Sequence, residues 1–333
     1  MVRTLRTADD GPMMTRAFQT LRGRATHRHA IYLCCDARFL PYALFLIDQI
    51  ATRNPARDFD LVLMSSTALP AHPLLEAHDV RVVQIDLDQL DVKLPVNARI
   101  PLASYLRIFG PGIFAADYDR MLYLDADVFY QRGDLSQLLR RDMKGYAIAA
   151  VRDMPQMRKP MRVPGEFKVM GLPHAKYFNA GIMLIDVPQW RADRIEERAL
   201  ELAARVGDKL EYHDQSALNG TVQGKWLEMN PVWNFVYSHQ SMFFSGMFDV
   251  CFYHFVGRRK PFMGSYGGFP LRFTEPYRRF MTEHWPEELP RVQDGLQAEQ
   301  KWHLLVGALL LHAAYARRYL RFEGYFRSDW DTR

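Results

Sequence analysis

The sequence predicts an α/β domain built on a mixed, mainly parallel sheet with helices on both faces, followed by a helical C-terminal appendage. From residue 30 onward, short apolar runs alternate with segments of helical periodicity, which is typical of a parallel sheet wound with helices. After about residue 270 the strand-like runs stop and aromatic, helical segments follow. We therefore expect a poorly ordered basic leader over 1–29, the α/β domain over 30–268 and the helical appendage over 269–333.

The strands of the sheet are predicted first from apolar runs rich in β-branched residues. The first half of the domain contains strands at 30–35, 60–65 and 81–86, separated by helical patterns at 40–52 and 70–77. A further strand at 120–124 leads into an Asp pair, and Asp134 is well placed to cap a helix over 134–141.

The second half of the domain continues the alternation with one long interruption. Residues 152–172 form a connection rich in Pro, Met, Arg and Lys, and loops of this length in a compact domain are usually functional or mobile. The other expected elements are a strand at 145–151, a strand over 176–187 that runs into a helix from Pro188 to 206, a short helix at 213–220, and strands at 225–230 and 251–257.

Composition limits the classes of protein that the chain can represent. With 333 residues, 48% of them hydrophobic and 24% charged, it can bury a large core. The net charge of +5 is small, and the basic residues are scattered without an interleaved aromatic groove, so no nucleic-acid partner is expected. The three cysteines lie in apolar runs, which favours reduced core thiols and a cytoplasmic setting.

Neither end of the chain carries a membrane-spanning or export segment by pattern. The N-terminus has arginines but lacks the continuous apolar stretch of a secretory signal. Residues 304–316 are the most hydrophobic segment, yet a bilayer requires about 20 apolar residues. We expect a buried or interfacial helix there.

The stretch MLYLDADVFY at 121–130 carries two carboxylates at the end of a strand that otherwise reads as buried. Burying unpaired charge is costly, so Asp125 and Asp127 must be exposed, paired or bound to a cation. Open α/β sheets bind ligands at the carboxyl ends of their strands. Asn179, the HDQ of 213–215 and the segment 252–261 also end apolar runs with polar groups, and these ends can converge on the Asp pair.

These motifs resemble the family 8 retaining glycosyltransferases, which have the GT-A fold and transfer a hexose from a UDP-sugar. The resemblance covers about residues 30–265 and rests on segments in the order of the family: LCCDARF, SYLRIF, YLDADVF, YFNAGIMLID, HDQSALNG and HFVGRRKP. It implies a donor that is UDP-glucose or UDP-galactose, and it leaves that choice open.

The resemblance also implies a divalent cation, Mn²⁺ or Mg²⁺, held by Asp125, Asp127 and His254. Two carboxylates and an imidazole suit such an ion, which would neutralise charge as UDP departs. Without the Asp pair, His254 would be interpreted as a core histidine between Tyr253 and Phe255.

The resemblance also implies which other residues of this chain contact the nucleotide. Gly257 and Lys260 match positions that hold the pyrophosphate, Asp36 and Phe39 match positions around the uridine, and Ala126 belongs to the same nucleotide site. The DARF stretch departs from the family, because Ala37 and Arg38 stand where relatives often carry a polar pair.

The sugar side of the site is assigned to Arg107, Asn179, Asp214 and Gln215, which match residues around the donor hexose. Arg107 has an equally good structural interpretation as the partner of an acid. Gln215 matches the position below the anomeric carbon, and because an amide is a poor nucleophile, we expect a same-face mechanism in which the leaving phosphate takes the acceptor's proton.

Two other functions remain open at this point. YLDADVF also fits the motif of haloacid-dehalogenase-type phosphatases, in which Asp125 would be the nucleophile, and the chain could be a non-catalytic UDP-binding relative. The acceptor, a glycan or lipid-linked glycan, is expected to contact residues 152–172 and the appendage. The tail over 304–333 could lie on the inner face of a membrane or pack on the domain, and both alternatives stay open.

Overall fold

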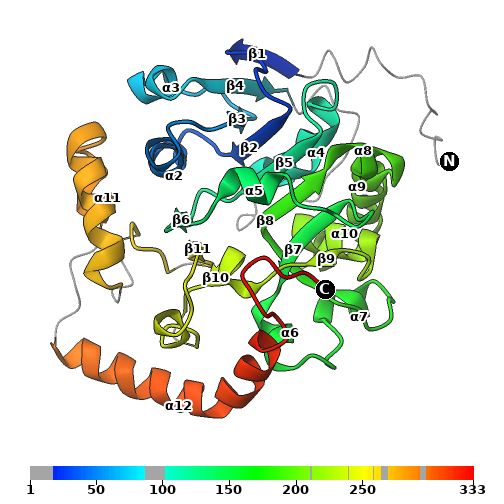
Figure 1. The fold of residues 1–333 in the computed structure, drawn as a ribbon, viewed down its shortest axis with the longest axis vertical. Coiled ribbons are helices and arrows are strands. Elements are labelled where there is room, and N and C mark those ends of the chain that lie inside the picture. Colours follow the sequence, from blue (N-terminus) through cyan, green and yellow to red (C-terminus); the bar gives the residue numbers. More distant parts are fainter. Residues whose placement is uncertain are drawn as a thin grey trace.

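The computed structural model describes residues 18–86, 102–210, 212–238, 240–257, 259–263, 269–292 and 298–333. A large twisted sheet forms the centre of the fold, with helices on both faces, and a small sheet lies beside it (Figure 1). This is the expected mixed α/β architecture.

The large sheet has eight strands in the order β1-β4-β3-β2-β5-β8-β7-β9. The central strands β2, β3, β4 and β5 are parallel, whereas β1 and β8 run antiparallel to their neighbours. The sheet is therefore mixed and mainly parallel. Its strands are Phe18–Arg22 (β1), His29–Cys34 (β2), Asp60–Ser65 (β3), Val80–Ile85 (β4), Arg120–Leu124 (β5), Ile148–Arg152 (β7), Phe178–Asp186 (β8) and Leu227–Glu228 (β9).

The small sheet has three strands in the order β10-β11-β6, which are Phe235–Val236, Phe252–His254 and Val128–Tyr130. Strand β6 follows β5 after a short turn, so the chain passes from the large sheet to the small one at the Asp pair. The expected strands at 225–230 and 251–257 are present as the shorter β9 and β11.

Alternation along the central strands builds two cores, one on each face of the large sheet. Ile31 and Leu33 pack with helix α2 (Leu40–Arg53), whereas Tyr32, between them, packs with helix α4 (Leu106–Ile113) on the other face. A sheet covered on both faces explains why its strands read as continuous apolar runs.

The helices follow the predicted order with two differences. The long helix expected from Pro188 to 206 is broken at Arg194, which has φ of 51°, and the long connection contains two short helices. Asp134 caps α5 as predicted, because its carboxylate accepts from the Gln137 N–H. The other helices are Pro73–Ala77 (α3), Leu135–Leu139 (α5), Met154–Arg158 (α6), Gly165–Val169 (α7), Val187–Ala192 (α8), Ile195–Val206 (α9), His213–Val222 (α10), Leu271–His284 (α11) and Ala298–Glu323 (α12).

Strand β1 lies inside the segment that the sequence analysis treats as a poorly ordered leader. Residues 18–22 pair antiparallel with β4, and Thr26 and His27 bind the buried carboxylate of Asp60. For residues 18–29 the expectation of disorder is wrong, because strand β4 supplies hydrogen-bond partners that a local pattern cannot reveal. Residues 1–17 lie outside the described residues.

Helix α12 carries the hydrophobic segment 304–316. One side packs on the protein through Ala308, Tyr319 and Phe322, which are all nearly inaccessible to solvent. The opposite side leaves Trp302 64% and Leu310 70% exposed, so the helix is only half buried. Among the described helices, none is both long enough and apolar enough to cross a membrane.

Two glycines in helices give a test of the packing between α4 and β2. A Cβ at Gly110 would lie 2.6 Å from Cε2 of the buried Tyr32, whose hydroxyl donates to the Arg107 carbonyl, so the ring cannot give way. We expect Gly110→Ala to lower the free energy of unfolding by about 1–3 kcal/mol in urea titrations. The matched control is Gly307→Ala in α12, where an added Cβ would have no atom within 4 Å. This substitution should raise the free energy of unfolding by up to about 1 kcal/mol. Equal effects would contradict this packing.

Candidate active site

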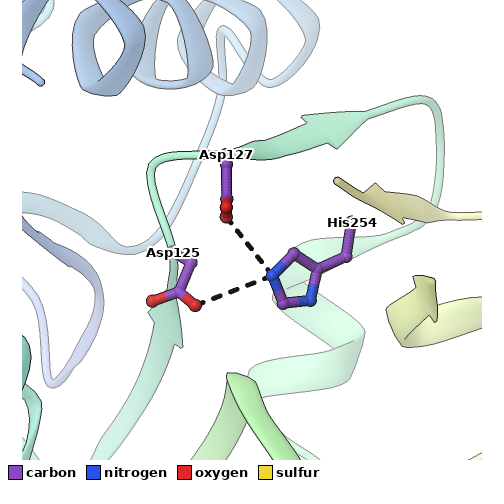
Figure 2. A group of neighbouring side chains, drawn as sticks. All are labelled: Asp125, Asp127 and His254. Atoms are coloured by element: carbon purple, nitrogen blue, oxygen red, sulfur yellow. Dashed lines mark ion pairs between the residues drawn. The ribbon is translucent and has the colours of Figure 1, made fainter. Parts of the chain in front are cut away.

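Asp125 and Asp127 lie in the turn that joins the two sheets, and His254 faces them from the end of β11. The antiparallel register of β6 and β11 pairs Val128 with His254, which brings the imidazole beside the aspartates. Its Nε2 lies 3.6 Å from Asp125 Oδ2 and 3.3 Å from Asp127 Oδ1 (Figure 2). One possible ligand atom from each of the three residues lies within 4.8 Å of the other two.

Gly181 makes room for this cluster. A Cβ at this position would lie 2.1 Å from Cε1 of His254 and 2.8 Å from Oδ2 of Asp125. The Gly181 carbonyl also accepts the Asp125 N–H at 2.8 Å, which fixes the turn after β5 against β8. The glycine of the FNAG motif is thus required by space, because any side chain would displace the two groups.

The tautomer of His254 follows from a chain of hydrogen bonds that starts at a backbone donor. The Gly181 N–H can only donate, so the atom of Asn179 that receives it at 3.1 Å is the side-chain oxygen. That oxygen also accepts from the Asn234 amide nitrogen at 3.0 Å, which leaves the Asn234 oxygen facing Nδ1 of His254 at 3.0 Å. Nδ1 must therefore carry the proton, and in the neutral ring Nε2 presents a lone pair to the aspartates.

Arg107 joins the Asp pair to helix α10. Its guanidinium lies 3.0 Å from Asp125 Oδ1 and 2.8 Å from Asp214 Oδ2, and it stacks 4.7 Å from the centroid of the Tyr123 ring. Burial alone would lower the pKa of Arg107, but the two carboxylates raise it well above its usual value. Arg107 therefore pairs with acids, which was the structural interpretation of this residue. Both acids, Asp125 and Asp214, are themselves residues assigned to the site.

Asp214 is almost fully buried in the first turn of α10. Burial raises the pKa of its carboxyl, and the nearby Arg107 opposes that rise. Gln215, the next residue, accepts the Ala180 N–H at 2.9 Å through its side-chain oxygen. That oxygen is therefore already engaged by β8, which makes Gln215 still less suited to act as a nucleophile.

Lys260 forms an ion pair with Asp127 and donates to the Phe255 carbonyl at 2.9 Å. Burial would raise the pKa of Asp127, but the charge of Lys260 and the contact with His254 lower it well below its usual range. Asp127 Oδ1 is buried and has no hydrogen-bond partner among the described residues, although it faces Nε2 of His254. Asp125 Oδ2, Asp127 Oδ1 and His254 Nε2 are three acceptor atoms that converge on one point, which suits the binding of a divalent cation.

A cavity of about 750 Å³ opens over this cluster. Most of the residues that the sequence assigns to the site line it: Arg107, Asp125, Asp127, Asn179, Asp214, Gln215, His254 and Gly257. Gly257 has φ of 73°, a conformation that favours glycine. The structure therefore brings together residues from five separate motifs.

Four assigned residues do not line this cavity. Ala126 lies between the aspartates and Lys260 is directed at Asp127. Asp36 and Phe39 follow β2, and because Leu33 pairs with Leu124, they leave the sheet at the same edge as the Asp pair. There the Asp36 carboxylate accepts the Phe39 N–H at 3.0 Å, and Phe39 packs on Tyr42.

The cavity has further walls that the motifs did not identify. Asp153, Met154 and Arg158 contribute from the start of the long connection, and Leu311 contributes from α12. Burial raises the pKa of Asp153 to about 6, with Asn179 and the Met154 N–H opposing it. The signal available in the sequence was the length of the 152–172 connection, which located the segment without indicating single residues.

A profile described as Glycosyl transferase family 8 matches residues 30–263. The chain belongs to glycosyltransferase family 8. The sequence-based expectation of the family is thus confirmed. The phosphatase alternative is thereby displaced, which agrees with the position of β5 after three other parallel strands of the sheet.

The relatives include enzymes of lipopolysaccharide synthesis. The lipopolysaccharide 1,2-glucosyltransferase of Escherichia coli K12 is 30% identical over 171 residues, which is 50% of this chain and 49% of that protein. The lipopolysaccharide 1,3-galactosyltransferase of Salmonella typhimurium LT2 is 28% identical over 202 residues, or 59% of each. The chain spans about half the length of the first curated relatives it matches.

Solved structures support the GT-A fold. The galactosyltransferase LgtC, in complex with donor and acceptor sugar analogues, superposes with a TM-score of 0.60 at 20% identity, over 82% of this chain and 99% of that chain. The bifunctional glycosyltransferase WbbM gives a TM-score of 0.62 at 17% identity, over 81% of this chain and 52% of that chain. These likenesses concern the fold alone.

Asn234 provides a test of the cluster, because it holds the protonated side of His254. We expect Asn234→Ala to weaken binding of Mn²⁺ by about 10–100-fold, since loss of a partner behind a ligating histidine frees its tautomer and orientation. Paramagnetic titration of Mn²⁺ measures this. The control Asn230→Ala removes an asparagine of the same segment that binds Val232 and Ser328 instead. Unchanged affinity in Asn234→Ala alongside the control would contradict the inferred hydrogen-bond chain.

Proposed function

We propose that the chain transfers a hexose from UDP-glucose or UDP-galactose to a hydroxyl of a glycan or glycolipid, with a divalent cation and with retention of anomeric configuration. The observation that carries this proposal is the convergence of Asp125, Asp127 and His254 at one wall of a cavity of about 750 Å³ in a family 8 chain. The non-catalytic alternative has no support from these residues, because each of them keeps a group competent for the chemistry.

Asp125, Asp127 and His254 would hold the cation. Mn²⁺ or Mg²⁺ in this position would neutralise the negative charge that develops on the diphosphate as UDP leaves. Lys260 and Arg107 already balance part of the negative charge of the three aspartates around them. The preference for a divalent cation therefore follows from the ligand atoms, two carboxylate oxygens and one imidazole nitrogen, and not from the net charge.

Arg107, Asp214 and Gln215 would position the donor sugar. Arg107 is held rigidly by two carboxylates and by the carbonyls of Ser104 and Ala180, at 3.1 and 3.0 Å. Because the Gln215 oxygen already accepts from Ala180, we propose that no protein nucleophile attacks the anomeric carbon. The bond from that carbon to the phosphate oxygen breaks, the acceptor oxygen bonds on the same face, and its proton passes to the departing phosphate.

A screen for release of UDP tests the class, the cofactor and the donor together. We expect the protein to release UDP slowly from UDP-glucose or UDP-galactose only when Mn²⁺ or Mg²⁺ is present. Asp127→Asn should lower kcat/KM by roughly 100-fold or more, because it removes charge that binds the ion. The control Asp142→Asn alters an exposed aspartate that caps only the backbone of Lys144. Metal-independent release, or equal rates in both variants, would contradict the proposal.

The stereochemical part has its own readout. Once a donor is known, NMR of the transferred sugar should show the anomeric configuration of the donor. An inverted product would exclude the same-face mechanism while leaving the transferase class intact.

Helix α12 supports a further part of the proposal, contact with an anionic membrane surface. Its exposed side carries large apolar residues at 302, 305, 306, 309 and 310, and Arg317, Arg318 and Arg321 follow on the same helix. Apolar side chains beside a basic cluster are typical of helices that lie in the plane of an anionic leaflet. We propose peripheral contact with the inner face of a membrane, where a lipid-linked acceptor would be presented.

Sedimentation with vesicles tests this contact. We expect binding to phosphatidylglycerol vesicles that decreases with salt and is weak on phosphatidylcholine vesicles. Leu310→Glu should reduce it about tenfold, whereas Leu271→Glu, at a 66% exposed leucine of α11, should leave it unchanged. Equal binding by the two variants would remove the membrane part of the proposal.

A further inference from the structure

Arg158 is a half-buried arginine in the cavity wall that lies away from the sheet. It is the last residue of α6 and lines the cavity together with Asp153, Met154 and Pro155. Helix α12 packs against α6 (Figure 1), and the Arg158 guanidinium lies 4.9 Å from the centroid of the Tyr315 ring. The aromatic ring holds the planar guanidinium in place, so its hydrogen-bond donors are oriented in advance.

Among the described residues, Arg158 forms no ion pair with a carboxylate, although the charge of nearby Asp153 reaches it, whereas several other partly buried arginines do form such pairs. Arg81, Arg120 and Arg152 form ion pairs with Asp117, Asp186 and Glu228 at 2.6–2.7 Å. No such pair involves Arg158 within the described parts of the chain. Burial lowers the pKa of Arg158, with Tyr315 and Asp153 opposing that shift. Partial burial of a guanidinium with no carboxylate in ion-pair contact is unfavourable, and such groups are common at sites that bind an anion.

The segments next to Arg158 are mainly basic, although Asp153 lines the same cavity. The sequence from 154 to 165 contains Arg158, Lys159 and Arg162 and no acidic residue. The facing part of α12, from 302 to 322, contains Arg317, Arg318 and Arg321, again without an acid. The charges on the outer residues are exposed, so they raise the local concentration of anions and add little to affinity, whereas Arg158 lies inside the cavity.

We propose that the acceptor of this enzyme carries an anionic group, a phosphate or a carboxylate, and that Arg158 binds it through paired N–H donors. The inference rests on the proposed transferase function and names the chemical class of its acceptor. Because Arg158 and the Asp125–Asp127–His254 cluster line the same cavity, one acceptor can place a hydroxyl near the donor sugar and an anion on Arg158. A planar guanidinium matches the oxygens of either anion in a bidentate arrangement.

Binding of three methyl β-glucosides that differ only at carbon 6 tests this inference without turnover. The three are the neutral glucoside, its 6-phosphate and the glucuronide, and saturation-transfer NMR in the presence of UDP and diamagnetic Mg²⁺ measures each affinity. We expect at least one charged glycoside to bind the unmodified protein about tenfold more tightly than the neutral one. Which of the two it is identifies the anion.

Variants separate recognition of the anion from support of α12. Arg158→Gln should abolish the preference for the charged glycoside, Arg158→Lys should retain part of it, and the matched control Arg162→Gln, at an exposed arginine of the same segment, should keep it. Thermal unfolding of each variant shows whether α12 remains docked. The inference would be overturned if the preference for a charged glycoside survives in Arg158→Gln. It would also be overturned if the unmodified protein shows no such preference, or binds neither charged glycoside.

The donor reaction is measured separately, so that the two proposals can fail independently. Metal-dependent hydrolysis of the UDP-sugar is measured on the unmodified protein and on Arg162→Gln, and the two rates should be equal, because Arg162 is exposed and does not line the cavity. Lack of hydrolysis in the unmodified protein would contradict the transferase function, whereas the binding comparison still decides whether Arg158 recognises an anion.

Discussion

The arrangement of this site depends on the cost of placing three carboxylates at the edge of a buried sheet. Asp125, Asp127 and Asp214 lie largely out of water, and each would be unstable there alone. Arg107 spans Asp125 and Asp214, Lys260 pairs with Asp127, and His254 faces both members of the Asp pair. The two sheets must meet at this point because the residues that compensate the charge come from opposite sides of the junction.

Small and amide side chains set the geometry behind the charges. Gly181 leaves the space that the imidazole and a carboxylate occupy, and its N–H begins the hydrogen-bond chain through Asn179 and Asn234 to His254. A backbone donor thus decides which nitrogen of the histidine is free. The FNAG motif, at the start of β8, supplies the space and the first polar group together.

Helix α12 of the C-terminal segment lines the cavity on one side and exposes apolar residues to solvent on the other. Leu311 of α12 lines the cavity, and the ring of Tyr315, one turn further along α12, packs on the Arg158 guanidinium. The same helix leaves an apolar face in solvent. One helix therefore connects the region proposed for the acceptor with the surface proposed for membrane contact, so a lipid-linked anionic acceptor would satisfy both features at once.

The sequence by itself determined the order of most strands and helices, the family and eight of the residues that line the cavity, because apolar periodicity and motifs such as YLDADVF and HDQSALNG are local in the chain. It did not reveal strand β1, the break at Arg194 or the exposed face of α12, since these depend on a distant strand, on one left-handed residue and on which side finds a partner. Tertiary structure alone decided that Asn234 holds His254 and that Arg158 lines the cavity with no ion pair to a carboxylate of the described residues. Each of those facts is a distance between residues far apart in the chain, and no local pattern encodes such a distance.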